Sequence, residues 1–176
     1  LWESPVHFVV LGLSKRVHDD VHDTHCQADG VPILRRCSGG GTVLQGPGCF
    51  NYSFVLPMDY HPDLASLHTT TGFMLQWVIR QLSPCMADIE HSGISDLVID
   101  AIKFSGNAQR RLKHALLFHG TVLYQFDIDA ITRYLKHPPV QPDYRKQRPH
   151  HAFVRNLPLA RDTLMRLFMA ECRHGT

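Results

Sequence analysis

Short runs of strand-forming residues recur along most of the chain, and this recurrence restricts the possible folds more than any other feature of the sequence. The runs cover residues 6–13, 31–36, 42–44, 50–56, 97–99, 102–104, 116–118 and 121–126. Glycines or polar residues separate them, and Gly106 and Gly120 are expected to mark breaks between the later runs. Helical stretches are interspersed without regular strand–helix alternation. We therefore predict an α+β fold with a mixed or mostly antiparallel sheet flanked by helices.

Helical character is expected in a few segments. From Pro62 to Leu82 apolar residues recur at helical spacing, Pro62 suits a first helical turn, and Pro84 is expected to end the helix. Residues 127–135 and 159–172 also have helical character. The stretch after Gly12 is expected to be a helical or looping excursion. Residues 138–149 are rich in proline and basic residues, which predicts an irregular connection.

Composition restricts the class of protein. The chain has 176 residues, of which 44% are hydrophobic, so it fits one domain with a buried core. Its formal charge of +2 is too small to indicate a nucleic acid or a membrane surface as partner. No apolar run approaches the roughly 20 residues of a transmembrane helix, and the N-terminus lacks a signal-peptide pattern. We expect one soluble, cytoplasmic domain over residues 1–176.

The thiols and imidazoles suggest little metal chemistry. The five cysteines are odd in number and none belongs to a Cys-x-x-Cys pair, so reduced thiols are expected. His18, His22, His25 and Cys26 could form a metal site if their stretch is helical. Such sites are rare, so we favour an irregular or short helical connection with Cys26 turned inward.

The first candidate site segment is a glycine triplet that follows a strand. Gly39 to Gly41 leave a turn without side chains, so its backbone could approach an anion or an apolar chain closely. Arg36, just before the triplet, could supply a planar donor fork for a carboxylate or phosphate. A plain tight turn is the alternative interpretation, and turn chemistry alone favours it.

The second candidate segment contains a lysine inside an apolar strand. Lys103 lies between Ile102 and Phe104, and burying an unpaired ammonium is costly, so an anionic partner is expected. Strand alternation alone favours the alternative that Lys103 points into solvent. Downstream, His119 could be a functional residue or a satisfied core histidine.

Taken together and in this order, the two segments resemble the signatures of the lipoate-protein ligase A family. Residues 35–43 are similar to Arg-Arg-x-Ser-Gly-Gly-Gly-Thr/Ala-Val, and residues 103–108 to Lys-x-Ser-Gly-Ser/Asn-Ala with the trailing His-Gly-Thr-Leu-Leu at 119–123. Residues 92–98 resemble the family's Gly-x-Asn-Asp-Leu-Val stretch, and residues 3–12 its first strand. The resemblance implies a fold like that of class II aminoacyl-tRNA synthetases and biotin ligases, although biotin ligases carry a different glycine-rich signature.

The chain also departs from the family pattern. Gln45-Gly46 stand where many members carry His-Asp, and Cys49 stands where Asn is often found, so the lipoate contacts of that histidine are not carried over. The sequence begins almost at the first strand, without the helix that usually precedes it or the C-terminal domain of the larger ligases. We expect either a trimmed fragment or accessory elements supplied elsewhere.

The resemblance implies an ATP-dependent activity. Lipoate or octanoate would be activated as acyl-AMP and transferred to a lysine of a lipoyl carrier domain, with Lys103 as an electrostatic clamp on the developing charge. Asp96 is a weaker candidate for binding Mg²⁺ or for ordering the nucleotide loop. The residues implied in binding lipoate and nucleotide are Arg36, Ser38, Gly39, Gly40, Gly41, Thr42, Ser105, Gly106, Ala108, His119, Gly120 and Thr121.

Two other functions stay open at this point. Octanoyltransferases of the superfamily use a cysteine nucleophile and no ATP; the corresponding position here is Asp88, and Cys85 lies nearby but out of register. A domain that only binds an acyl chain or carrier protein would have little reason to place Lys103 beside Ser105-Gly106. The basic run 145–148 could dock an acidic carrier domain, but a solvated loop is favoured.

Overall fold

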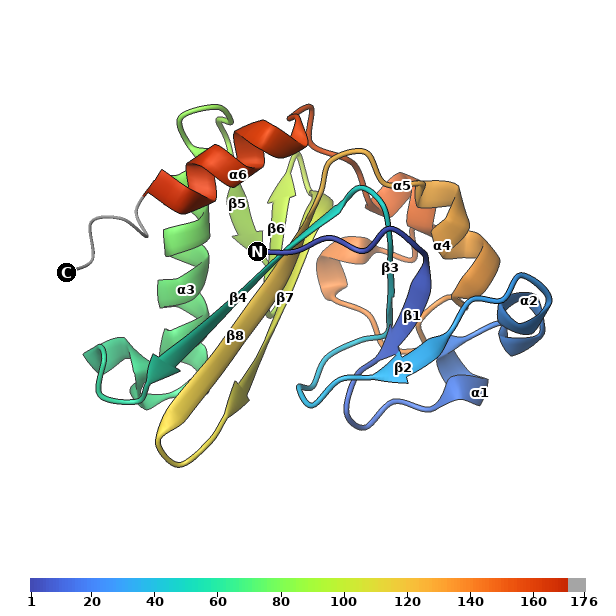
Figure 1. Cartoon of the computed structure of the whole chain (residues 1–176), viewed down its shortest axis with the longest axis horizontal. Coiled ribbons are helices and arrows are strands. Elements are labelled where there is room, and N and C mark those ends of the chain that lie inside the picture. Colours follow the sequence, from blue (N-terminus) through green and yellow to red (C-terminus); the bar gives the residue numbers. More distant parts are fainter. Residues whose placement is uncertain (171–176) are drawn as a thin grey trace.

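The computed structural model describes residues 1–170, and two β-sheets form its framework (Figure 1). The smaller sheet has the order β2-β1-β3, with β1 (Phe8–Leu11), β2 (Ile33–Arg35) and β3 (Val43–Gln45). The larger has the order β4-β8-β7-β6-β5, with β4 (Cys49–Pro57), β5 (Glu90–Ser92), β6 (Asp96–Ile99), β7 (Ile102–Arg111) and β8 (Ala115–Leu123). The pairs of the larger sheet are antiparallel, while β1 is parallel to β2 and antiparallel to β3. The predicted α+β class is confirmed, with two sheets in place of one.

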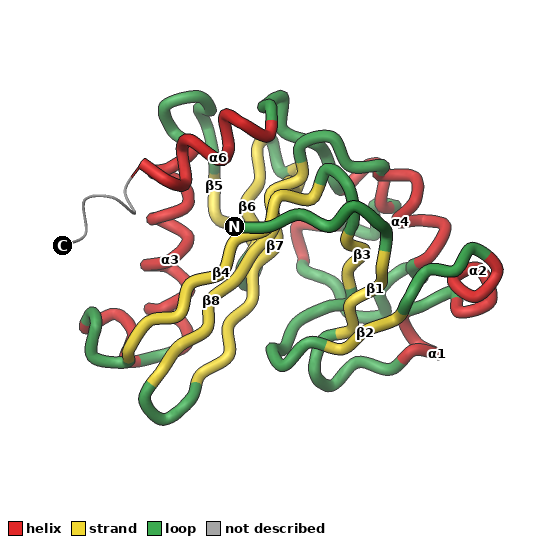
Figure 2. Tube along the Cα trace, in the orientation of Figure 1, coloured by secondary structure: helices red, strands yellow, loops and turns green. Residues whose placement is uncertain are grey.

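Helices cover the outer side of each sheet (Figure 2). Helices α3 (Leu67–Leu82) and α6 (Arg161–Ala170) pack on one face of the larger sheet. Their apolar residues join those of the strands in one core that includes Phe50, Tyr52, Leu75, Val78, Phe104, Leu116, Phe118, Leu164 and Phe168. Full burial of each such side chain contributes about 1.5–3 kcal/mol, so this core fixes the larger sheet against its helices.

A second core lies under the smaller sheet. Val9, Leu11 and Leu44 pack there against α2 (Asp23–Ala28) and α4 (Ile128–Tyr134). Cys26 is 1% exposed in this core, as the sequence predicted. Within residues 1–170 no group of three His, Cys, Asp or Glu side chains could hold a metal ion, so the alternative metal site near His22 is not formed there. The short helices α1 (Val17–Asp20) and α5 (His150–Phe153) complete this side.

The expected helix from Pro62 to Leu82 is interrupted. A 3-10 turn, η1 (Pro62–Ala65), precedes α3, and extended Ser66 separates the two. The Ser66 side chain accepts a hydrogen bond from the Thr69 N–H and so caps the helix. The apolar spacing continues across this break, which is why the pattern alone predicted one helix.

Two glycines that were expected to separate strands lie inside them. Gly106 is within β7 and Gly120 within β8. In both strands another side chain occupies the space where a β-carbon would lie, which explains why glycine stands at these positions. Strand β5 and helix α5 were not predicted. The segment 138–149 is mostly irregular, as expected, but contains the 3-10 turn η2 (Asp143–Arg145).

The C-terminal helix was expected over residues 159–172. It begins at Arg161 and continues to Ala170, and residues 171 and 172 lie outside the described part of the chain. None of the helices formed by residues 1–170 is long and apolar enough to cross a bilayer.

Candidate active site

One face of the larger sheet carries five of the predicted site residues, namely Lys103, Gly106, Ala108, His119 and Thr121. In the antiparallel register Gly106 pairs with Thr121 and Ala108 with His119, and paired residues point to the same side. Lys103 points to this side too, since its amine lies over Gly106. We call this side, opposite α3, the site face.

Ser105 and Gly120 lie on the other face, and their expected role in binding lipoate or nucleotide stays a prediction. Ser105 is 1% exposed and accepts a hydrogen bond from the Asn107 amide. A side chain at position 120 would collide with Asn107 and with the Tyr52 hydroxyl, which are hydrogen bonded to each other. These residues support the strand that carries Lys103 from behind.

Lys103 has the anionic partner that the cost of burial predicted. Its Nζ lies 2.7 Å from Oδ1 of Asp96, and the two side chains are 26% and 14% exposed. The other oxygen of Asp96 accepts a hydrogen bond of 2.7 Å from the Tyr144 hydroxyl. The alternative of a lysine directed into solvent is therefore wrong.

Gly106 provides the surface on which the Lys103 amine rests. A β-carbon at this position would lie 3.0 Å from Nζ and 3.1 Å from Cε of Lys103. Contacts this short would force the lysine to move. The glycine of the second motif thus admits the amine close to the strand backbone, which gives the motif a physical reason beyond turn formation.

The glycine loop is shaped by the guanidinium of Arg36. Its Nη2 donates to the carbonyls of Gly39 and Gly41 at 2.6 and 2.8 Å, and its Nε donates to Ser38 Oγ at 3.1 Å. Gly40 has φ of 93°, a left-handed conformation that favours glycine. Burial lowers the pKa of Arg36 from its ordinary value. The guanidinium thus holds loop carbonyls here, and its role on phosphate stays a prediction that requires some of these bonds to exchange.

Ser38 connects the glycine loop to the site face. Its hydroxyl is buried and lies 2.6 Å from Nε2 of His119 on β8. The pKa of His119 is lowered to about 4, mainly by burial and to a smaller extent by the nearby positive charge of Arg36. The ring is therefore neutral at pH 7. Since Gly106 pairs with Thr121, His119 and Gly106 are diagonal neighbours, about 7–8 Å apart. The loop therefore meets the sheet close to Lys103.

Thr42 points behind the loop. Its hydroxyl donates to Oδ2 of Asp20 at 2.5 Å, and Lys15 Nζ lies 3.7 Å from the same oxygen. Asp20 is 5% exposed and lies at the end of α1. Thr42 therefore anchors the loop to the smaller sheet's side of the molecule, and its expected ligand contact stays a prediction. No sequence pattern indicated Asp20.

Gln45, one of the positions that depart from the family pattern, belongs to a closed polar group with Thr121 and Asn51. Gln45 donates to Thr121 Oγ1 at 2.9 Å, Thr121 donates to Asn51 at 2.6 Å, and Asn51 donates back to Gln45 at 2.9 Å. A side chain on Gly46 would collide with the ring of His7, which fills that space. Thr121 is thereby fixed beside Gly106 on the site face.

Comparison with known proteins settles the family. A model described as the lipoyl protein ligase A/B catalytic domain matches residues 1–171. The chain belongs to this family. The Bacillus subtilis lipoate-protein ligase LplJ is 31% identical over 128 residues, which cover 73% of this chain and 37% of LplJ. The chain thus spans less than half of the length of the curated relatives it matches, for example 37% and 39% of the Bacillus subtilis and Staphylococcus aureus ligases and 48% of the Aeropyrum pernix protein.

Solved structures of lipoate-protein ligases share the fold. One is a bipartite ligase of Thermoplasma acidophilum, solved in work on an archaeal lipoylation system that includes its E2 lipoyl domain. It superposes with a TM-score of 0.79 at 22% identity, and the match covers 96% of this chain and 68% of the Thermoplasma chain. A lipoate-protein ligase A bound with ATP gives a TM-score of 0.78 at 22% identity, and the match covers 96% of this chain and 69% of that ligase. The family and fold that the motifs implied are confirmed.

Neither Cys49 nor Cys85 provides a nucleophile beside Lys103. Cys49 is fully buried, and burial raises the pKa of its thiol to about 12. Cys85 is exposed and follows α3, on the opposite side of the sheet from the site face. These two cysteines therefore give no support to a cysteine-based transferase mechanism.

Asp96 does not form a metal site in this arrangement. Its two oxygens are engaged by Lys103 and Tyr144, and within residues 1–170 no cluster of three metal-binding side chains is present. The Mg²⁺ role of Asp96 stays a prediction.

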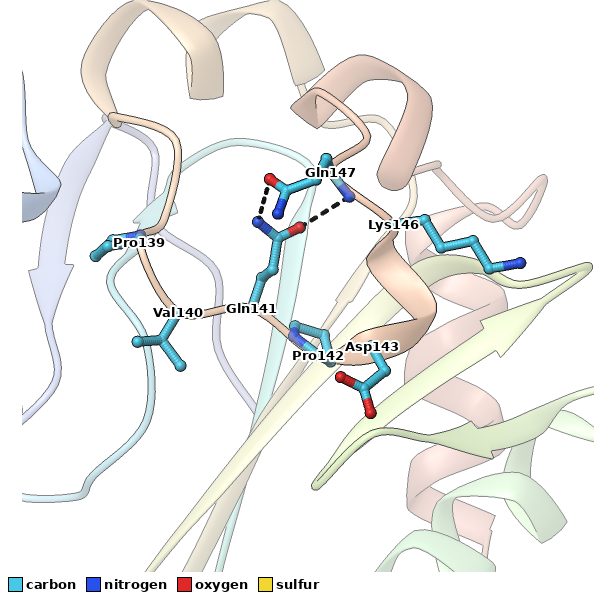
Figure 3. A pocket seen from close by; sticks show the side chains of 7 residues that line it. All are labelled: Pro139, Val140, Gln141, Pro142, Asp143, Lys146 and Gln147. Carbon is cyan, nitrogen blue, oxygen red and sulfur yellow. Dashed lines mark hydrogen bonds between the residues drawn. The ribbon is translucent and has the colours of Figure 1, made fainter.

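The segment 139–147 curls around a hollow of about 410 Å³ (Figure 3). The lining residues are Pro139, Val140, Gln141, Pro142, Asp143, Lys146 and Gln147. Gln141 and Gln147 are joined by two hydrogen bonds across it. The expectation of a solvated basic run at 145–148 is wrong for Arg145, which is 5% exposed and lies over the ring of Phe153 at 4.6 Å.

Proposed function

We propose that this chain is the catalytic domain of an ATP-dependent lipoate-protein ligase. The observation that carries the proposal is the Lys103 amine, held over Gly106 by Asp96 on the face that the glycine loop meets through Ser38. Membership of the family and the ATP-bound ligase with the same fold support it. A cytoplasmic setting is part of the proposal.

In the first step the carboxylate of lipoate or octanoate attacks the α-phosphorus of ATP. A carboxyl oxygen–phosphorus bond forms, and the bond to the β-phosphate oxygen breaks, which gives acyl-AMP and pyrophosphate. Negative charge develops between the acyl carboxyl and the α-phosphate. The ammonium of Lys103 donates hydrogen bonds to that point, which lowers the barrier because the donor is already fixed before charge develops.

In the second step the amine of an acceptor lysine attacks the acyl carbonyl carbon. The carbon–oxygen bond to AMP breaks, AMP leaves, and the attacking amine loses a proton as the amide forms. Lys103 stabilises the carbonyl oxygen and the departing phosphate in the same position. The described E2 lipoyl domain of the Thermoplasma acidophilum system supports a lipoyl carrier domain as acceptor.

The glycine loop would flank the acyl chain and the adenylate. At Gly39 and Gly41 no heavy atom lies within 4 Å of a β-carbon built there, so space is open beside this backbone. Ser38 is fixed by Arg36 and His119 and holds the loop at a constant distance from the sheet. These residues would bind and orient the substrates, and Lys103 would act on the reacting atoms.

The test is the requirement for ATP. The chain is incubated with lipoate or octanoate, labelled pyrophosphate and ATP, and incorporation of label into ATP is measured. Exchange that depends on the acid supports the proposal. Acyl transfer from octanoyl carrier protein without ATP, lost in Cys85→Ala, would establish the transferase instead.

A further inference from the structure

Asp96 is held from two sides. Its Oδ1 pairs with Lys103 and its Oδ2 accepts the Tyr144 hydroxyl, each at 2.7 Å. A carboxylate with one partner can still rotate about its last bond, whereas separate partners on the two oxygens fix its plane. The lysine side chain is long and flexible, so it cannot fix that plane itself. The second partner, Tyr144, therefore decides how steadily Asp96 faces the amine.

Tyr144 comes from a segment that is tied to the hairpin carrying Lys103. Nη2 of Arg148 donates to the carbonyl of Tyr144 at 2.9 Å and to the carbonyl of Ala101 at 2.8 Å. Ala101 belongs to the turn between β6 and β7, two residues before Lys103. One guanidinium thus fixes the backbone behind the tyrosine relative to the backbone behind the lysine.

The ring of Tyr144 is also fixed by packing. The centre of the Tyr144 ring lies 5.2 Å from that of the Phe153 ring. The guanidinium groups of Arg145 and Arg148 both lie over the Phe153 ring. A β-carbon at Gly93 would come within 3.2 Å of the Tyr144 ring, so the ring rests close to the backbone before β6. Burial and the charge of Asp96 raise the pKa of the Tyr144 hydroxyl, which therefore stays a donor.

We propose that Tyr144 is a positioning residue for Lys103. Its hydroxyl holds the carboxylate of Asp96, and the carboxylate holds the amine over Gly106, where charge develops in the reaction. The catalytic part of this inference rests on the proposed function, whereas the placement of the amine does not. Loss of the hydroxyl should lower the rate of the chemical step and leave substrate binding nearly unchanged, because the amine acts on the transition state.

The test uses Tyr144→Phe in the full chain, since this change removes one oxygen and keeps the packed ring. For lipoate-dependent pyrophosphate exchange we expect kcat to fall about tenfold, with KM for lipoate within about twofold, as for partners that orient a functional side chain. A second readout is independent of activity. Competitive acetylation with acetic anhydride, measured by mass spectrometry of peptides, should label Lys103 faster in the variant relative to the exposed Lys146.

Tyr134→Phe is the matched control. The Tyr134 hydroxyl donates to Asp29 at 2.9 Å, and Asp29 pairs with Arg133 at 2.6 Å, so the same kind of bond is lost at a different place. We expect wild-type kcat and wild-type labelling of Lys103. The inference is overturned if Tyr144→Phe keeps both, if KM alone changes, or if the two variants behave alike. Absence of exchange in the wild type would reject the proposed function, and labelling would still decide the placement.

Discussion

The two cations on either side of the candidate site are held in different ways. Arg36, on the side of the glycine loop, distributes its donors over the Ser38 hydroxyl and backbone carbonyls that include those of Gly39 and Gly41. Lys103, on the sheet, is held by the carboxylate of Asp96. The Arg36 guanidinium fixes the shape of the glycine loop, whereas the Lys103 ammonium is paired with a carboxylate, which is an anion like the carboxylate of its proposed substrate.

This difference predicts different functions. A planar fork that bridges fixed carbonyls keeps a loop in shape, and its loss should weaken binding of whatever the loop contacts. An ammonium paired with one carboxylate has further N–H donors, which can reach a phosphate or carboxylate of the substrate while the first carboxylate keeps its place. We therefore expect changes at Arg36 to act mainly on KM and changes at Lys103 mainly on kcat.

The largest effect is expected for Lys103→Ala. Removal of the amine should lower kcat for lipoate-dependent pyrophosphate exchange by about 10²–10³, the loss seen when one fixed donor to a developing charge is removed. The free energy of unfolding should change by about 1 kcal/mol or less, since the lost ion pair is partly exposed. Exchange kinetics and urea unfolding measure the two quantities.

Lys136→Ala serves as the control for this change. Its Nζ donates to the carbonyl of His18 at 2.6 Å, on the far side of the smaller sheet, so exchange activity should be unaltered. Wild-type exchange by Lys103→Ala would contradict the assignment of Lys103 and remove the basis of the comparison.

The next largest effect is expected for Arg36→Lys. A lysine keeps the charge but cannot reach the hydroxyl and the carbonyls together, so the loop loses its shape. KM for lipoate should rise about tenfold while kcat changes less, and stability should fall by about 1 kcal/mol, because the lost bonds to Ser38 and Val10 are partly buried and those to Gly39 and Gly41 are exposed. Steady-state exchange kinetics at varied lipoate give both constants.

Arg111→Lys separates loop shape from stability. Arg111 donates to the carbonyls of Leu64 and Ala65 and to the hydroxyl of Thr70, so it also gathers acceptors around a turn, but beside α3. We expect a similar loss of stability with unchanged KM. A fall in kcat at constant KM in Arg36→Lys would show that the two cations act alike.

The sequence predicted the parts of the site that depend on local chemistry. The cost of burying an ammonium implied an anionic partner for Lys103, and the structure supplies Asp96. The placement of the glycine triplet between two strands is also confirmed. These inferences succeeded because each depends on one residue and its immediate neighbours.

Contacts between distant segments could not be predicted in this way. Tyr144 and Asp96 are 48 positions apart, and Ser38 and His119 are 81 apart, so no spacing indicates that they meet. Gly106 was misinterpreted for a related reason. Glycine in a strand pattern signals either a turn or a close approach, and only the position of the Lys103 amine shows which applies.

A smaller effect is expected for Gly106→Ala. The added β-carbon would lie 3.0 Å from the Lys103 amine and push it from its place, so kcat should fall about three- to tenfold for a displacement well below 1 Å. Gly72→Ala in α3 is the control, since nothing lies within 4 Å of its β-carbon; it should keep kcat and add about 0.5–1 kcal/mol of stability. Equal kcat in both variants would mean that the amine does not depend on Gly106.

The smallest effect is a pH dependence on the side of the glycine loop. Folding lowers the pKa of His119 from 6.5 to about 4. Between these values the unfolded chain binds a proton that the folded chain does not, so stability should fall as pH decreases from about 6.5 to 4. His150, whose pKa is also lowered to about 4, adds to this slope.

In His119→Gln the urea midpoint should fall less steeply over this range than in the wild type, whereas replacement of the exposed His68 by Gln should leave the slope unchanged. An unaltered slope in His119→Gln would contradict a lowered pKa of His119 in the folded chain.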